Sequence, residues 1–261
     1  MTDRTFTRPG AQLAYTLVGE DQPAPLVISA HGLSSSRAND EQLGLSFDAL
    51  AEHRPLLRYD ARAHGNSTGR PIAADYTWSA LADDLLALAD EFSPDAPVDA
   101  VGASMGCGTV LHAAVRRPER FRRLVLVIPP TAWETRAVQA AGYQTMAGLV
   151  EQRGVDAFVE LAAGFENPPA MPAGLVLRPA VSDELLPTVF RGAASADLPP
   201  ADEVASVTSP VLILAWSGDP GHPLSTAERL ARLLPEAELR IADSPDGVAQ
   251  WVGLAEEFLA R

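Results

Sequence analysis

The chain has 261 residues, 47% of them hydrophobic and 21% charged, a composition typical of a globular protein with a full core. Its net charge of −14 repels phosphate backbones and anionic lipids, so we expect a small-molecule substrate rather than nucleic acid or a membrane. All 20 basic residues are arginine, which excludes a lysine Schiff base, a lysine general base and a Walker phosphate loop.

Cys107 is the only cysteine, so an internal disulfide and a thiolate metal cluster are both excluded. No metal-ligand spacing or dinucleotide fingerprint occurs, and we expect no cofactor. The apolar runs are too short to span a bilayer, and the first ten residues lack the pattern of a secretory signal. These features predict a cytoplasmic protein and leave its oligomeric state open.

Short apolar runs with β-branched residues predict seven strands. They lie at 12–19, 25–30, 55–60, 98–103, 123–128, 210–216 and 238–242. Apolar residues at helical spacing predict helices between most of them. These helices lie at 79–92, 105–117, 226–235 and 248–261. The alternation predicts an α/β fold: a mostly parallel, twisted sheet flanked by helices on both faces.

One long interval, from Pro129 to about Ser209, contains no convincing strand. It holds short helical patterns separated by proline-rich joints such as "NPPAMP" and "DLPP". We interpret it as a helical cap inserted between two strands. The predicted domains are therefore a core made of 1–130 and 209–261, and a cap or lid made of 131–208.

The sequence Gly102-Ala103-Ser104-Met105-Gly106 matches G-x-S-x-G and falls where a predicted strand turns into a predicted helix. The small residues on each side let strand and helix approach closely, which pushes the serine hydroxyl out above the sheet edge. The alternative interpretation is a tight turn that happens to contain a serine.

Three further segments reduce the weight of that alternative. "HGL" (31–33) follows a second buried strand, where a backbone amide can help to bind an oxyanion. "YDARAHGNSTG" follows a third strand, and "LAWSGDPGHP" ends a late strand at Asp219. With these segments in this order, the chain resembles the α/β-hydrolase fold superfamily, in its capped form, over nearly its whole length.

This resemblance implies roles for four positions. Ser104 would be the nucleophile, the amides of Leu33 and Met105 would form the oxyanion hole, and Asp219 would be the acid that orients a histidine. The family histidine normally follows the last strand, but that loop reads "IADSPDGVAQW" here, and no histidine occurs after His222. The usual C-terminal catalytic histidine is therefore missing.

The chain has five histidines that must be considered as replacements. His53 is expected to face solvent, His112 lies too far along its helix, and His64 is expected to tie its own loop together. His31 is expected to support the oxyanion loop, although a role as base stays open. His222, three residues after Asp219, could complete a relocated triad of Ser104, His222 and Asp219, or it could cap the next helix or line the pocket wall.

The leading hypothesis is a serine hydrolase, similar to esterases or lactonases, that acts on small apolar esters, lactones or thioesters. An alternative is a non-hydrolytic lyase, cyclase or isomerase that uses the oxyanion hole without acyl transfer. A third is a small-molecule binder on the same scaffold. The separation of the Ser104 hydroxyl oxygen from the nearer ring nitrogen of His222 discriminates most sharply: about 3 Å favours the triad.

Overall fold

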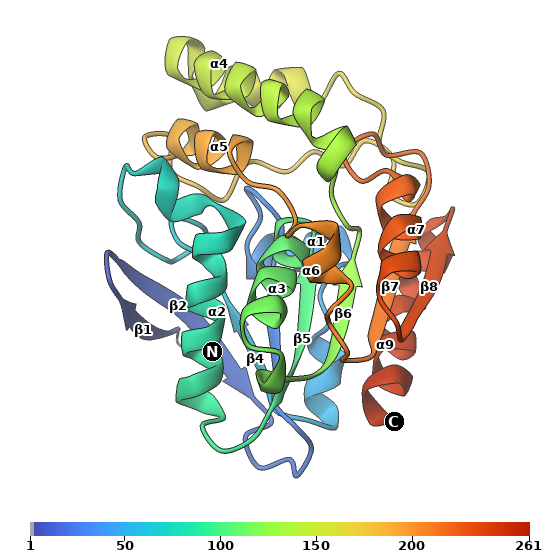
Figure 1. Ribbon diagram of the computed structural model, residues 1–261. Coiled ribbons are helices and arrows are strands. Elements are labelled where there is room, and N and C mark those ends of the chain that lie inside the picture. Colours follow the sequence, from blue (N-terminus) through green and yellow to red (C-terminus); the bar gives the residue numbers. More distant parts are fainter. Residues whose placement is uncertain (1–2) are drawn as a thin grey trace.

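The computed structural model describes residues 3–261 and contains one eight-stranded sheet with helices on both faces (Figure 1). The strands are β1 (Arg4–Arg8), β2 (Ala11–Val18), β3 (Val27–Ala30), β4 (Leu56–Tyr59), β5 (Val98–Ala103), β6 (Phe121–Val127), β7 (Val211–Trp216) and β8 (Ala237–Ala242). Their order across the sheet is β1-β2-β4-β3-β5-β6-β7-β8. β1 and β2 pair antiparallel, β2 also pairs antiparallel with β4, and every later pairing is parallel.

Nine α-helices lie in residues 3–261, several joined by short 3₁₀ turns. The helices are α1 (Arg37–Leu43), α2 (Trp78–Phe92), α3 (Met105–Arg116), α4 (Arg136–Ala162), α5 (Leu186–Ala194), α6 (Ala201–Val204), α7 (Leu224–Leu233), α8 (Pro245–Ala249) and α9 (Trp251–Ala260). The 3₁₀ turns are Asp48–Glu52, Ala73–Tyr76, Pro118–Arg120 and Trp133–Thr135.

Two hydrophobic clusters sandwich the sheet. One joins its first face to α2, α3, α6 and α7, with Trp78 and Leu111 completely enclosed. The other joins its second face to α1, α8 and α9, with Trp251 and Phe258 at its centre. Because both faces are covered, every residue of β5 and β7 is buried, which explains why these strands read as continuous apolar runs.

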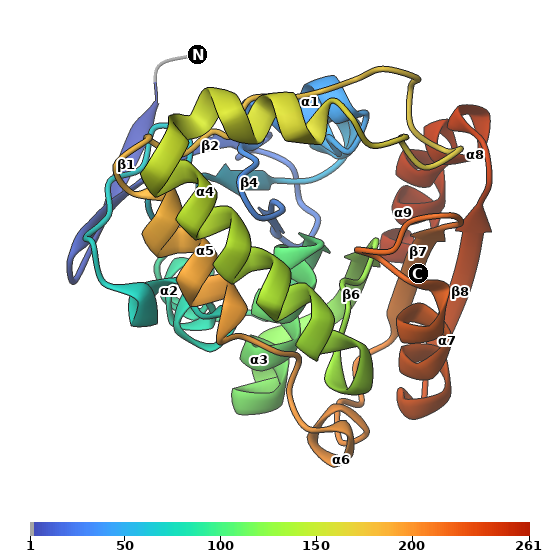
Figure 2. The same cartoon turned by 90° about the horizontal axis from the view of Figure 1, so that it is seen from above.

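The segment between β6 and β7 holds α4, α5 and α6 and no strand. In Figure 1, α4 and α5 lie side by side beyond the end of the sheet at which β5 and β6 finish, and Figure 2 shows them mainly over the side of the sheet that carries α2 and α3. α4 is interrupted at Gly154, where φ is 80°. Arg136, at the start of α4, is buried and donates to the backbone oxygens of Ala193 and Ala196.

The predicted fold class is confirmed, and all seven predicted strands are present to within two residues. β1 and α1 lie outside the predicted set. β1 reads "RTFTR" and is an edge strand with only one apolar residue, so its sequence carries almost no alternating hydrophobic signal. The predicted helix over 248–261 is divided at Gln250 into α8 and α9.

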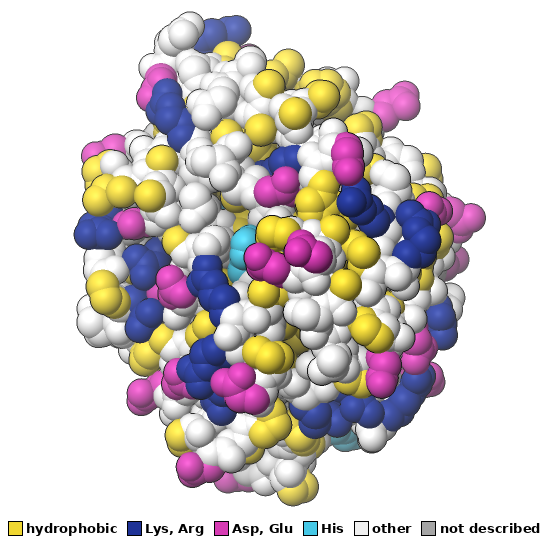
Figure 3. Space-filling model, viewed as in Figure 1, with side chains coloured by type: hydrophobic (Ala, Val, Ile, Leu, Met, Phe, Trp, Pro, Cys, Tyr) yellow, Lys and Arg dark blue, Asp and Glu magenta, His cyan; other side chains and the backbone are white. Residues whose placement is uncertain are grey.

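Arginine and acidic side chains lie close together over much of the face shown in Figure 3. Two exposed ion pairs join α2 to the end of α3: Arg116 pairs with Asp83 at 2.7 Å, and Arg117 pairs with Asp90 at 2.8 Å. Such exposed pairs each contribute little to stability, about 0 to 1 kcal/mol. They do place positive charge beside negative charge across the α2–α3 contact.

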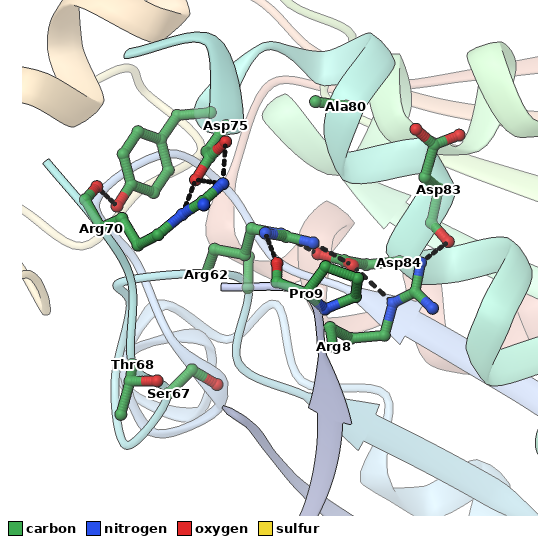
Figure 4. Close-up of polar contacts among 12 residues, drawn as sticks. Arg8, Pro9, Arg62, Ser67, Thr68, Arg70, Asp75, Ala80, Asp83 and Asp84 are labelled. Carbon is green, nitrogen blue, oxygen red and sulfur yellow. Dashed lines mark hydrogen bonds and ion pairs between the residues drawn. The ribbon is translucent and has the colours of Figure 1, made fainter. Parts of the chain in front are cut away.

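A buried ion pair near the start of the sheet is of a different kind (Figure 4). Asp84 of α2 is 1% exposed and accepts from Nη2 of Arg62 at 2.8 Å and from Nε of Arg8 at 2.9 Å. Arg62 also donates to the Pro9 carbonyl at 2.8 Å. Asp84 therefore ties β1 and the loop after β4 to the helix that covers them.

We predict that Asp84→Asn lowers the free energy of unfolding by about 3 kcal/mol, because Arg62 then stays buried without a countercharge. The matched control is Asp83→Asn in the same helix turn, whose side chain is 63% exposed. That change is expected to cost no more than about 0.5 kcal/mol. Urea denaturation of both variants and the wild type measures the difference, and equal losses would contradict the prediction.

Candidate active site

Ser104 lies in a sharp turn between the end of β5 and the start of α3. Its backbone has φ 50° and ψ −108°, a strained conformation for a residue with a Cβ. Two hydrogen bonds hold the turn: the Ser104 amide donates to the Val127 carbonyl, and the Cys107 amide donates to the Ser104 carbonyl, both at 2.9 Å. The neighbouring strand β6 and the first turn of α3 thus fix the serine from opposite sides.

The glycines on both sides of this turn are required by contact with backbone atoms. A Cβ added at Gly106 would lie 2.1 Å from the carbonyl oxygen of Ala30, and one added at Gly102 would lie 2.3 Å from that of Gly106. Both separations are far below van der Waals contact, so α3 can approach β3 and β5 only with glycine at these positions. The G-x-S-x-G spacing follows from this packing.

His222 contacts Ser104 directly. Its Nε2 lies 2.8 Å from the Ser104 Oγ, and its Nδ1 lies 2.7 Å from Oδ2 of Asp219. His222 and Asp219 share the loop after β7, where the His222 amide donates to the Asp219 carbonyl at 3.2 Å. Of the five histidines, the structure therefore brings His222 together with Ser104 and Asp219, within the distance that favours a triad.

Asp219 keeps its negative charge although it is largely buried. Burial by itself raises the pKa of this carboxyl, but hydrogen bonds from His222, the Trp216 indole and the Gly221 amide outweigh that effect and lower the pKa to about 2. The Trp216 bond measures 2.9 Å and the Gly221 bond 2.8 Å. An ionised carboxylate only accepts, so the His222 proton sits on Nδ1 and Nε2 is free to accept from the Ser104 hydroxyl.

The two predicted oxyanion residues lie beside Ser104. Met105 is the first residue of α3, and Leu33 follows Gly32, whose missing Cβ would lie 3.5 Å from the Ser104 Cβ. Within residues 3–261, neither the Leu33 nor the Met105 amide donates to another group of the protein. Both N–H groups are therefore available, and that of Met105 also lies at the positive end of the α3 dipole.

His31 and His64 hold loops rather than reaching Ser104. The His31 Nε2 accepts from the Ala61 amide at 2.9 Å, and the His64 Nε2 accepts from the Ser34 amide at 3.2 Å. In each ring Nδ1 lies 2.7 Å from a backbone carbonyl, so no nitrogen remains to accept another proton. Burial lowers the pKa of His31 and lowers that of His64 to about 3, which keeps both rings neutral.

The remaining two histidines lie away from the serine. His53 has a side chain that is 62% exposed and pairs with Glu256. His112 Nε2 lies 2.9 Å from the carbonyl oxygen of Asp197, in the segment between α5 and α6. Neither residue lines the cavity that Ser104 faces.

Ser104 and His222 open onto a cavity of about 210 Å³. Its wall is mostly apolar and is contributed by the loop after β3, the α1 region, the ends of β5, β6 and β7, and one residue of the segment before α5. The lining residues are Gly32, Leu33, Ser35, Asp40, Leu43, Leu45, Ala103, Ser104, Ile128, Met171, Trp216, Asp219 and His222. An apolar cavity of about 150 Å³ holds one benzene molecule, so this one accepts a small substrate group.

Sequence reasoning did not single out three polar residues of this site. Trp216 is the last residue of β7 and bonds Asp219 through its indole N–H, while Ser35 and Asp40 lie on the cavity wall. A tryptophan at the end of a buried strand is expected to be a core residue. Trp216 is indeed buried, and its indole N–H also bonds Asp219. The spacing Trp216, Asp219, His222 places three interacting side chains at intervals of three and is the one sequence signal that could have indicated their contact.

The sequence of residues 25–248 matches the alpha/beta hydrolase fold family. This match spans most of the chain and includes the turn at Ser104 and the loop that carries Asp219 and His222. The chain therefore belongs to the α/β-hydrolase fold family.

Individual relatives agree with this assignment. The chain is 28% identical to a 2-(acetamidomethylene)succinate hydrolase of Mesorhizobium japonicum, over 88% of this chain and 84% of the relative. Among solved structures it is similar to a hydrolase from Pseudomonas aeruginosa PA01, with 24% identity and a TM-score of 0.80, over 99% of this chain and 98% of that chain. It is also similar to the enol-lactonase from Burkholderia xenovorans LB400, with 21% identity and a TM-score of 0.71, over 99% of this chain and 100% of that chain. The chain is an enzyme of the hydrolase class on this scaffold.

We predict that Gly106→Ala lowers the free energy of unfolding by more than about 2 kcal/mol, since the new methyl group meets a backbone oxygen that cannot move aside. Gly142→Ala in α4 is the matched control, because nothing lies within 4 Å of the added Cβ. In a helix that change is expected to stabilise by up to about 1 kcal/mol. Thermal unfolding followed by circular dichroism measures both, and a stable Gly106→Ala protein would contradict the packing argument.

Proposed function

We propose that the protein is a serine hydrolase that cleaves small apolar esters, lactones or thioesters by acyl transfer through Ser104. One observation carries the proposal: an unbroken chain of hydrogen bonds runs from the Ser104 hydroxyl through both ring nitrogens of His222 to Asp219. A serine hydroxyl is a weak nucleophile unless a base removes its proton during attack, and this arrangement supplies that base.

The reaction follows from these contacts. The Ser104 oxygen attacks the substrate carbonyl while His222 Nε2 takes the hydroxyl proton, and Asp219 stabilises the resulting imidazolium through Nδ1. Negative charge then builds on the former carbonyl oxygen, where the amides of Leu33 and Met105 donate to it. His222 returns the proton to the leaving alcohol, thiol or ring oxygen. A water molecule activated by the same imidazole hydrolyses the acyl-enzyme and regenerates Ser104.

The position of the base in the acid's own loop is consistent with this role. Triad roles are set by geometry and not by sequence order, so a histidine three residues after the aspartate can serve if its ring reaches the serine. Pro220 and Pro223 restrict the backbone on both sides of His222, which limits the entropy lost in holding the ring over Asp219. The loop after β8, where the family histidine normally lies, can then be free of catalytic groups.

We also propose that residues 131–208 act as a cap over the cavity, on a core formed by 1–130 and 209–261. Support comes from α4 and α5, which lie beyond the carboxyl ends of the parallel strands in Figure 1, and from Met171, which contributes to the cavity wall. Such a cap would shape the pocket and exclude water during acyl transfer.

The non-hydrolytic and binding alternatives have less support. Both were motivated by the missing C-terminal histidine, and a contact of 2.8 Å between His222 and Ser104 removes that motive. The similarity to a 2-(acetamidomethylene)succinate hydrolase also favours hydrolysis.

We predict that Ser104→Ala and His222→Ala each reduce kcat for p-nitrophenyl butyrate by about 10⁴-fold or more, as removal of a triad member does elsewhere. Both should also lose covalent labelling by a fluorophosphonate, because the nucleophile is absent in one and not activated in the other. Mass spectrometry of the labelled wild type should locate the adduct on Ser104.

His53→Ala is the matched histidine control for this experiment and should keep full labelling and activity, since that side chain is exposed and distant from the cavity. Retention of labelling in His222→Ala would refute the relocated triad. An inert wild type that nevertheless folds would refute the hydrolase proposal itself.

A further inference from the structure

The cavity wall contains a second carboxyl group, Asp40 of α1, that the proposed acyl transfer does not use. Its residue is 6% exposed, and its Oδ1 accepts from the Ser35 hydroxyl at 2.8 Å. Its other oxygen, Oδ2, accepts no hydrogen bond from residues 3–261. Oδ2 is not fully buried, and Asp40 contributes to the wall of the cavity that Ser104 faces, so we infer that Oδ2 is the atom that opens onto it.

The surroundings of Asp40 shift its carboxyl toward the neutral form. Burial raises the pKa of this carboxyl to about 7, and the Ser35 hydroxyl offsets only part of that effect. Through space Arg58 lowers the pKa, whereas Asp60 and Asp48 raise it. Asp219 and His222 line the same cavity. With Ser35 donating to Oδ1, the proton of the neutral acid belongs on Oδ2, where it points to the substrate space.

We propose that Asp40 Oδ2–H binds a second oxygen of the substrate, an uncharged acceptor such as an ether or keto oxygen in the acyl chain, remote from the carbonyl that Ser104 attacks. The inference deepens the proposed function and rests on it. Ser104 and Asp40 line one small cavity, so a single short chain can contact both. The true substrate class is then a short oxygenated ester or lactone rather than a plain aliphatic one.

The apolar remainder of the wall explains why this contact would discriminate between substrates. Leu43, Leu45, Ile128 and Met171 offer no hydrogen bonds from their side chains, so a substrate oxygen beside them depends on the polar groups of the wall. Among these groups, the Ser35–Asp40 pair has no part in the proposed acyl transfer. A purely aliphatic chain would instead leave the Asp40 hydroxyl without an acceptor, which carries a desolvation penalty. A carboxylate substrate is disfavoured by the charge of Asp219 on the same cavity.

The experiment compares matched substrates in matched variants. p-Nitrophenyl β-methoxypropanoate is paired with p-nitrophenyl pentanoate, and p-nitrophenyl γ-methoxybutanoate is paired with p-nitrophenyl hexanoate, so that each pair differs by one ether oxygen. The ratio of kcat/KM within a pair is measured for the wild type, Asp40→Leu and Asp40→Asn. Dividing the wild-type ratio by the variant ratio cancels the chemical reactivity of the ether and leaves its coupling to residue 40.

For Asp40→Leu we expect the preference for the ether ester of at least one pair to fall by about 3-fold to 10-fold, the worth of one hydrogen bond. Asp40→Asn should keep the preference, because its amide still donates to the cavity while its oxygen accepts from Ser35. In the wild type the preference should decline as the pH rises through about 7, since the ionised carboxylate cannot donate. Asp40→Asn should show no such decline.

The outcomes separate the two proposals. Equal ratios in all three proteins, with hydrolysis of the aliphatic esters and labelling of Ser104 intact, would overturn the role of Asp40 and leave the hydrolase proposal standing. Absence of hydrolysis and labelling in the folded wild type would overturn both. Should Asp40→Leu not fold, the pH profiles of the wild type and Asp40→Asn decide: identical profiles within each pair overturn the inference, and a decline confined to the wild type supports it.

Discussion

The site depends on one steric constraint, the close approach of α3 to the strands below it at the Ser104 turn. With Gly106 against the Ala30 carbonyl, helix and sheet come close enough to hold Ser104 at φ 50°. A non-glycine residue in such a conformation costs about 1 to 3 kcal/mol, which the surrounding core must offset. The result is a hydroxyl held in a fixed position, which the proposed role of Ser104 as the nucleophile requires.

Because the Ser104 hydroxyl is held in one position, the histidine of the proposed triad can come from any segment whose imidazole reaches that hydroxyl. In this chain it comes from a loop that already holds Asp219, so one turn supplies both partners and no second loop has to be positioned independently. Asp219 is fixed in turn by the Trp216 indole and the Gly221 amide, which constrain its orientation from β7 and from within the loop. Because one loop carries both Asp219 and His222, less conformational entropy is lost in bringing the proposed triad together than if two loops had to be ordered.

Features of the fold and the site that depend on local sequence could be predicted, whereas those that depend on contacts between distant segments could not. Short apolar runs predicted the strands β2 to β8, and the glycines around Ser104 indicated a local steric requirement, so both could be predicted. β1 was not, because an exposed edge strand held by Asp84 and the arginines around it carries a polar sequence. The direction of the His222 ring was left open because three-residue spacing in a proline-rich loop fits several conformations. Asp40 belongs to no recognisable sequence motif. Its position on the cavity wall follows from the packing of α1, which the sequence does not reveal.

The two carboxyls that line the cavity illustrate how environment assigns opposite states to identical groups. Asp219 receives three donors and stays ionised, with its pKa lowered to about 2, so it can stabilise a positive imidazolium. Asp40 receives one neutral hydroxyl, and burial raises its pKa to about 7. Two negative charges on so small a cavity would repel each other and any electron-rich substrate. On the proposals made above, the ionised Asp219 would serve the proton relay through His222, and the neutral form of Asp40 would donate to the substrate.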